Sequence, residues 1–453
     1  MQKPTDRLRR RFLALASLAA LLPAFLFGCN GPDDNDDGGG VKPEKPARNV
    51  ILLIGDGMGV GQVTLGRLAG PGVHEGLGLE KTPYVGLVKT YSTGALVTDS
   101  AAAATAFSTG RKTVNGTIGM SPDGNDIENL AEWCRKNGKS VGLVTTTTVT
   151  HATPACFAVH CSERKRESEI AELFLKSGVE VLMGGGLRYF PDALQKQFRD
   201  RGYTFALNRQ EMMSSAEPHL IGLFSPSHMD FEIDRDPAVQ PSLEEMALKA
   251  LKVLDEDKDG FFLMIEGGRI DHACHGHDAG TMVRDVAAFD LAVRAAVAFA
   301  EREGNTLVLV TADHACGGLA ITEKVNIERL RAQKASAEKM ARFVNDGKQD
   351  LAAVLREWSG AEADEETLKQ IRGLEDITPA PYGLQNAVAH VLSERAGIGW
   401  HPLHIQATHL VTKGHDGADV ALYAWGPRAG DFTGVLENTE VGVRIRRAME
   451  KPR

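Results

Sequence analysis

Residues 261–275 read FFLMIEGGRIDHACH, and this stretch decides the fold. Its first five residues are apolar without polar alternation, which predicts a strand buried on both faces. Similar β-rich runs occupy residues 49–54, 140–149 and 306–311. Segments with a helical pattern lie between them, for example at 126–136, 243–254 and 281–303. This alternation predicts an α/β fold with a large, mainly parallel central sheet flanked by helices on both faces.

The composition is that of an ordinary soluble globular enzyme. The chain has 453 residues, of which 43% are hydrophobic and 25% are charged. This balance excludes a polytopic membrane protein, a collagen and a mostly disordered chain. The formal net charge of -9 argues against a nucleic-acid-binding protein, which would normally be basic. Residues 323–400 are helical and polar in pattern, so we expect an insertion between two parts of a catalytic core, 48–322 and 401–453.

The first 28 residues have the pattern of an export signal. Arginines at positions 9–11 precede an apolar run over 12–28, which is too short for a spanning helix and contains Pro23. The order RRRFL resembles a twin-arginine signal, the route for proteins exported already folded. We therefore expect an exported protein.

Cys29 follows this signal in a sequence, LFGC, that resembles a bacterial lipobox. In that reading Cys29 becomes the lipidated N-terminus, and the alternative is plain secretion in which Cys29 has no role. Residues 29–47 are acidic and rich in Gly and Pro, which predicts a flexible tether. The expected location is the cell envelope, through a lipid anchor, or the periplasm.

Acidic residues and histidines follow the predicted strands. They are Asp56, Glu266, Asp271, His275, Asp313 and His314, with His415 just before a strand-like run at 421–426. Parallel sheets place their chemistry at the carboxyl ends of strands. Carboxylates and imidazoles there suit magnesium or zinc, and one helical turn would direct Asp271 and His275 to one ion. A single pair of this kind is usually structural, but four clusters at strand ends favour a metal centre.

Ser100 is a candidate nucleophile. It precedes the alanine-rich, strongly helix-forming stretch 101–106. One interpretation is a simple helix N-cap. The other is functional, because the free N–H groups of a helix N-terminus favour a bound phosphate. A serine hydroxyl bound to zinc can lose its proton without a histidine base.

Taken together, the motifs resemble those of metal-dependent alkaline phosphatases over nearly the whole chain after the signal. In the family's order they are GDGMG (55–59), VTDSAAAATAFSTG (97–110), THATPA (150–155), MGGG (183–186), GLFSPSHMDFEIDRD (222–236), FFLMIEGGRIDHACH (261–275), TADHA (311–315) and TKGHDGADV (412–420). The resemblance implies hydrolysis of a broad range of phosphate monoesters through a phosphoserine, with two zinc ions and one magnesium ion.

The resemblance also implies a role for each matching residue. Ser100 would be the nucleophile. Arg164 would clamp the phosphate with its guanidinium fork, although its charged neighbours also fit a solvated helix charge. The first zinc would bind Asp271, His275 and His415, the second Asp56, Asp313 and His314, and the magnesium Asp56, Thr153 and Glu266.

His151 and His272 depart from many bacterial relatives, which carry Asp and Lys there, and resemble the animal enzymes instead. We expect both near the magnesium and the phosphate. Nitrogen favours zinc over magnesium, so magnesium should bind loosely. The alternative is that His151 is a packed core residue. Ser225 and Gln240 stand where animal members have acidic calcium ligands, so no calcium site is expected.

Cys274 and Cys316 lie beside predicted metal ligands. The sequence leaves open whether they form a disulfide. Because both zinc sets are complete, the sequence does not favour either thiol as a ligand. The nine remaining histidines are assigned to the surface or the core, and among them His404 and His409 lie where the chain returns to the active site.

Three other functions are disfavoured by the sequence. A sulfatase would need a C/S-x-P-x-R motif, whereas three alanines follow Ser100. A phosphodiesterase of this superfamily usually lacks the third metal site, for which Thr153 and Glu266 are present. A non-catalytic lipoprotein that binds phosphate or metal would be expected to have lost a ligand or the nucleophile. The family often dimerises, so the insertion could form a crown over the site or a homodimer contact.

Overall fold

The computed structural model describes residues 45–361, 363–376, 382–403 and 412–450, which belong to one compact unit. The predicted export signal, Cys29, His404 and His409 lie outside the described residues. Within the described part, no helix combines the length and the apolar character needed to cross a membrane.

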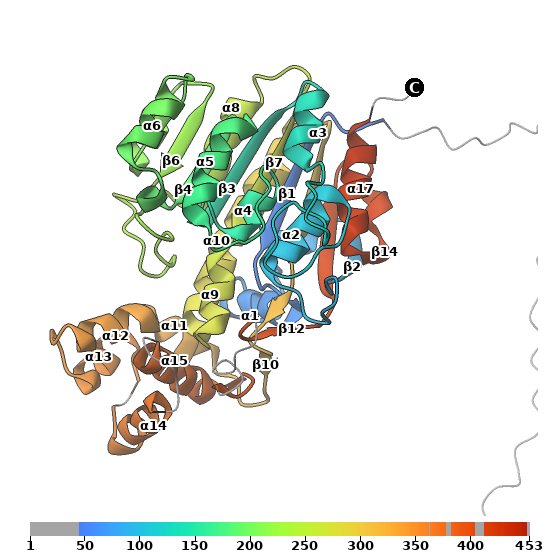
Figure 1. The fold of residues 1–453 in the computed structure, drawn as a ribbon. Helices are drawn as coiled ribbons and strands as arrows, with labels where there is room; N and C mark the ends of the chain where they lie inside the picture. Colours follow the sequence, from blue (N-terminus) through green and yellow to red (C-terminus); the bar gives the residue numbers. More distant parts are fainter. Residues whose placement is uncertain (1–44, 362, 377–381, 404–411, 451–453) are drawn as a thin grey trace, which may run out of the picture. The chain divides into compact units, whose positions relative to one another are not determined.

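A ten-stranded sheet forms the core, in the order β14-β2-β13-β8-β1-β7-β3-β4-β6-β5 (Figure 1). The strands are β1 (Asn49–Gly55), β2 (Tyr84–Lys89), β3 (Ser140–Thr148), β4 (Val181–Gly185), β5 (Thr204–Ala206), β6 (Leu220–Leu223), β7 (Phe261–Gly267), β8 (Thr306–Thr311), β13 (Val420–Trp425) and β14 (Gly434–Glu437). Neighbouring strands are parallel except at β13, which is antiparallel to both β8 and β2. The three central strands β1, β7 and β8 are buried along their whole length, which explains their unbroken apolar runs.

Helices cover both faces of the sheet, which confirms the predicted α/β architecture. In Figure 1, α2 (Ser100–Thr109), α3 (Leu130–Lys136), α4 (Ala152–Cys156) and α17 (Asn438–Met449) lie on one face. The other face carries α1 (Val60–Ala69), α8 (Leu243–Leu254) and α10 (Ala279–Glu303), and α10 contacts both of the others. Further helices are α5 (Glu167–Ser177), α6 (Asp192–Arg199), α7 (Arg209–Ser214) and α9 (Arg269–His275).

One predicted helix begins later than its sequence pattern indicates. The pattern covers 126–136, whereas α3 starts at Leu130. Asn129 caps this helix, because its side chain accepts from the Glu132 backbone while the Glu132 side chain accepts from Asn129 N–H. This reciprocal capping box stops the helix from extending backwards.

The segment between the two parts of the core is helical and has its own apolar cluster. Its helices are α11 (Ile327–Ala332), α12 (Ala337–Asn345), α13 (Leu351–Trp358), α14 (Glu365–Glu375) and α15 (Gly383–Arg395). Residues such as Met340, Leu355 and Val388 are buried against one another within it. A short antiparallel ribbon of β10 (Ala320–Ile321) and β11 (Ile398–Gly399) brings its two ends together.

Candidate active site and metal centre

The candidate site lies at the carboxyl ends of β1, β7 and β8. Ile54 of β1 is in register with Glu266 of β7 and with Thr311 of β8, so the three strands end at the same level. Asp56 is the first residue after β1, and Asp313 is the second residue after β8. Parallel pairing thus brings together residues that are far apart in the sequence, as the strand-end pattern predicts.

The first group of side chains contains Asp271, His275 and His415. Asp271 and His275 are one turn apart on α9, and the His275 Nε2 atom lies 3.1 Å from Asp271 Oδ2. His415 lies in the short strand β12 (His415–Asp416), with Nε2 3.1 Å from His275 Nε2 and 3.7 Å from Asp271 Oδ1. Two imidazole nitrogens and a carboxylate oxygen therefore converge on one point, as a borderline metal requires.

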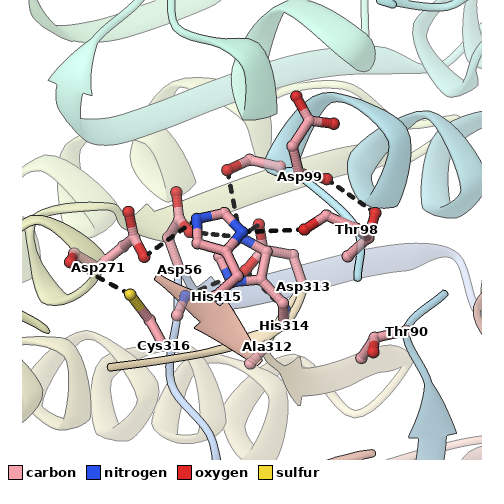
Figure 2. Close-up of polar contacts among 12 residues, drawn as sticks. Asp56, Thr90, Thr98, Asp99, Asp271, Ala312, Asp313, His314, Cys316 and His415 are labelled. Atoms are coloured by element: carbon pink, nitrogen blue, oxygen red, sulfur yellow. Dashed lines mark hydrogen bonds and ion pairs between the residues drawn. The ribbon is translucent and has the colours of Figure 1, made fainter. Parts of the chain in front are cut away.

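The second group contains Asp56, Asp313 and His314, all of them fully buried. His314 Nε2 lies 3.2 Å from Asp313 Oδ2 and 3.4 Å from Asp56 Oδ1 (Figure 2). The imidazole of His314 stacks on that of His415, with 3.5 Å between ring centroids. The first and second groups therefore lie side by side and form one centre.

The third group contains Asp56, Glu266 and His151, each with a ligand atom within 4.8 Å of the others. Thr153, in α4, is fully buried, and its Oγ1 has no hydrogen-bond partner among the described residues. The same is true of Asp56 Oδ2 and Glu266 Oε1. Buried oxygens without partners are costly, and a bound cation would satisfy them. These residues therefore fit a metal ion.

The electrostatics of the first two groups also fit cations. Burial, together with the charges of Asp313 and Asp271, raises the pKa of Asp56 well above its ordinary value. Burial opposes ionisation of Asp271 too, but the neighbouring histidines, His275 first, hold its pKa well below the ordinary value. Burial disfavours a charged His314, yet Asp313 beside it raises the pKa of that imidazole. Asp56 thus lacks a compensating positive charge, which a bound cation would supply.

Ser100 is the first residue of α2, and its side chain faces the second group. Ser100 Oγ lies 3.4 Å from His314 Nε2. The N-cap of the helix is Asp99, whose Oδ1 accepts from the backbone N–H of Ala102. The interpretation of Ser100 as a simple N-cap is therefore wrong, and its hydroxyl remains available for chemistry.

Arg164 lies before α5 rather than on a helix. Its guanidinium donates through Nη1 to Asp99 Oδ2 at 3.1 Å and through Nη2 to His151 Nε2 at 3.0 Å. Its side chain is 22% exposed, and that of Asp99 is 3% exposed. The alternative of a solvated helix charge does not hold, because Arg164 is anchored beside Ser100.

His151 and His272 lie close together, and a third ring, His228, completes a cluster. The ring centroids are 5.8 Å apart for His151 and His272, 4.6 Å for His228 and His272, and 5.7 Å for His151 and His228. His151 also contacts Arg164, so it is not a packed core residue. From the sequence, His228 is assigned to the surface or the core, whereas the structure places it beside His151 and His272; the one sequence signal for it is its place in the matching stretch 222–236.

Cys274 and Cys316 are free, buried thiols in the structure. Gln62 contacts both residues: its Nε2 donates to the Cys316 carbonyl oxygen at 2.7 Å and to Cys274 Sγ at 3.7 Å. Cys316 Sγ lies near the first group and points to the backbone oxygen of Asp271 at 3.9 Å (Figure 2).

Comparison with known proteins gives one consistent result. The family model described as alkaline phosphatase matches residues 47–451. Alkaline phosphatase 3 of Bacillus subtilis is 33% identical, with 97% of each chain covered. The crystal structure of Thermus thermophilus alkaline phosphatase is 32% identical, with a TM-score of 0.81 over 89% of this chain and 91% of that one.

A third similar structure contains bound magnesium. It is a variant of the alkaline phosphatase from the Antarctic bacterium TAB5, in which aspartate replaces a histidine and magnesium is bound in the M3 site. It is 26% identical, with a TM-score of 0.67 over 90% of this chain and all of that one. The full-length matches, together with the residues gathered at the strand ends, show that this chain belongs to the alkaline phosphatase family of enzymes.

Proposed function

We propose that this phosphatase hydrolyses phosphate monoesters through a phosphoserine on Ser100, with two zinc ions and one magnesium ion as cofactors. The observation that carries the proposal is the position of the Ser100 hydroxyl. It starts a helix whose free N–H groups suit a phosphate, lies 3.4 Å from His314 Nε2, and neighbours the Asp99–Arg164 pair. A nucleophile, an anion clamp and candidate cation ligands thus meet at one point.

Ser100 and Arg164 have different roles in the proposed reaction. Ser100 attacks phosphorus and the alcohol leaves, so the phosphoryl group passes to the serine oxygen, and water then releases inorganic phosphate. Arg164 binds two phosphate oxygens through its fork, which orients the phosphorus for attack. When bound, the metal ions supply the positive charge that favours a deprotonated serine and balances charge on the transferred group.

The chemistry of the donors supports the assignment of the metals. The first two groups combine imidazole nitrogen with carboxylate oxygen, which suits zinc. The third offers oxygen from Asp56, Thr153 and Glu266, which suits magnesium. His151 adds a nitrogen to this third group, and nitrogen favours zinc. We therefore infer that magnesium binds loosely there and that excess zinc competes for its place.

A parallel assay tests the proposed reaction. The purified enzyme would be given a phosphate monoester, a phosphate diester and a sulfate ester under identical conditions, with the metal content measured on the same sample. We expect the monoester to be the best substrate by a large factor, with close to two zinc ions and one magnesium ion per chain. Preferential cleavage of the diester or the sulfate ester would replace the proposal with the corresponding activity.

We also propose that the enzyme forms a homodimer through the edge of its sheet. Val85 and Leu87 of β2 and Val435 of β14 are 52%, 41% and 59% exposed, and Leu87 pairs with Val435 across the two strands. An exposed apolar patch on neighbouring strands favours burial against a partner. Val435→Asp should shift the sedimentation coefficient from that of a dimer to that of a monomer.

Finally, we propose export by the twin-arginine route and a lipid anchor at Cys29. The support is the sequence pattern of residues 1–29 alone. The membrane would be contacted only through this lipid, and the substrates would be small phosphate monoesters outside the cytoplasm.

A further inference from the structure

Arg269 is almost completely buried next to the candidate site. It is the first residue of α9, the helix that carries Asp271 and His275. Its side chain is 8% exposed, and its guanidinium lies 3.6 Å from the ring centroid of Phe231. This cation–π contact and the burial fix the plane of the guanidinium.

One arm of the guanidinium determines which nitrogen of His272 carries a proton. Arg269 Nη1 lies 2.8 Å from His272 Nδ1. A guanidinium has only donors, so Nδ1 must accept and must keep its lone pair. A neutral His272 that makes this contact carries its proton on Nε2. A ring with the opposite tautomer would set two donors against each other at this short distance.

The other arm is held by the helical insertion. Arg269 Nη2 donates to Glu338 Oε2 at 3.3 Å, and Arg342 donates to Glu338 Oε1 at 3.2 Å. Glu338 lies in the first turn of α12, whose N-cap Ser336 is bound by Asp234 of the catalytic core. Arg269, Glu338 and Arg342 also line a cavity of about 150 Å³. The guanidinium of Arg269 thus ties the insertion to α9.

We propose that Arg269 is a positioning residue that holds His272 in the Nε2–H tautomer, so that His272 offers a hydrogen-bond donor to the phosphate or its bound water. This inference rests on the proposed function for the identity of the ligand. The ring of His272 lies 5.8 Å from that of His151, which contacts the phosphate-clamping Arg164. Glu338 serves to aim the guanidinium, and it touches neither His272 nor the reacting atoms.

Nitrogen NMR of histidine-labelled holoenzyme tests the tautomer directly. We expect the wild-type signals of His272, identified by their loss in His272→Gln, to show a protonated Nε2 and an unprotonated Nδ1. In Arg269→Met, which keeps much of the side-chain volume and removes the donors, the Nδ1–H tautomer should become populated. An unchanged Nε2–H tautomer in Arg269→Met would overturn the proposal.

A double-mutant cycle separates positioning from a merely structural role. If Arg269 acts through His272, Arg269→Met and His272→Gln should each lower kcat/KM by about ten-fold, and the double variant should be no worse than His272→Gln. Arg269→Lys should rescue part of the loss. Fully additive losses would show that Arg269 acts elsewhere and would sink the proposal.

Arg342→Met is the matched control, because Arg342 lines the same cavity and contacts the same carboxylate but not His272. It should change neither the tautomer nor kcat/KM beyond about two-fold, and an effect as large as that of Arg269→Met would contradict the assignment. The thermal midpoint of each variant shows whether it is folded. Absence of monoester hydrolysis in the wild type would overturn the proposed function, while the NMR result would still decide the tautomer.

Discussion

Asp99 binds Arg164 with one carboxylate oxygen and caps the helix of Ser100 with the other. Oδ2 accepts from Arg164 Nη1 at 3.1 Å, and Oδ1 accepts from Ala102 N–H at 2.9 Å. The proposed phosphate clamp, Arg164, and the proposed nucleophile, Ser100, are therefore positioned by the same side chain. A shift of either group would have to move Asp99, which also accepts from the backbone N–H of Gly116.

Arg164→Ala should weaken the inhibition of the enzyme by inorganic phosphate as well as catalysis. Each hydrogen bond from its guanidinium to phosphate contributes about 1.5–3 kcal/mol, so the inhibition constant should rise by at least about ten-fold. Steady-state inhibition measurements check this. Arg166→Ala is the control, since Arg166 is 52% exposed and pairs only with Glu163 and Glu169 in the described structure. Equal inhibition constants in wild type and Arg164→Ala would show that Arg164 does not bind phosphate.

Ser100→Ala should abolish formation of a phosphoenzyme. Acid quenching during turnover, followed by mass spectrometry, should find phosphate on Ser100 in the wild type and none in the variant. Turnover should fall steeply, and any remaining hydrolysis would come from direct attack of water. Because Asp99 still caps α2, the thermal midpoint should change little. Phosphate trapped on a different residue would refute the assignment of the nucleophile.

Removal of the metals should lower the stability of the folded enzyme. Asp56, Glu266, Asp271 and Asp313 are buried together, and a cation bound only in the folded state balances their charges. A metal present at one hundred times its dissociation constant adds about 2.7 kcal/mol to the free energy of unfolding. Calorimetry before and after chelation should therefore show a lower thermal midpoint, restored by zinc and magnesium. An unchanged midpoint would mean that these groups hold no metal.

His151→Asp should tighten magnesium binding and reduce inhibition by excess zinc. The substitution replaces a neutral imidazole by a carboxylate in the third group, which adds negative charge and hard oxygen. Magnesium titrations at fixed zinc should show activation at lower concentrations than in the wild type. His272→Lys would be combined with it as a second variant, because the two rings are neighbours. The same magnesium dependence in wild type and His151→Asp would contradict the prediction.

Cys29→Ser should release the protein from the membrane fraction or block its processing. The wild type should partition into a detergent phase, whereas the variant should remain in the aqueous phase or accumulate as a precursor. Inactivation of twin-arginine export should retain the precursor in the cytoplasm. A mature N-terminus at any residue other than Cys29 would overturn the lipid anchor and favour plain secretion.

The sequence predicts the strand ends well because buried parallel strands have a simple signature. β1, β7 and β8 are apolar throughout, so Asp56 and Asp313 stand out as the first charged residues after their strands. The convergence of Asp271 and His275 can be predicted equally well, because residues four apart on a helix lie on the same face. Local rules were sufficient at these positions.

Long-range partners were not predictable in the same way. The charged neighbours of Arg164 along the chain suggest a solvated side chain, and only tertiary packing brings it to Asp99. His228 likewise gains its place in the site from His272 on another element, and Arg269 is bound by Glu338 of α12. The late start of α3 is a different case, because the apolar pattern alone extends too far toward the N-terminus, whereas the capping box of Asn129 and Glu132 marks where the helix begins.

The position of His415 in the sequence determines when the group of Asp271, His275 and His415 can form during synthesis of the chain. His415 follows the whole helical insertion and lies in a short strand that pairs with Ala315 and Cys316, far earlier in the chain. During translation, the ribosome therefore synthesises Asp56, Asp271 and Asp313 long before it adds His415, which completes the group. Closing such distant contacts is slow relative to helix formation. A chain truncated before residue 415 therefore cannot assemble the group, and any metal that the group holds gains its full set of ligands only after His415 has been made.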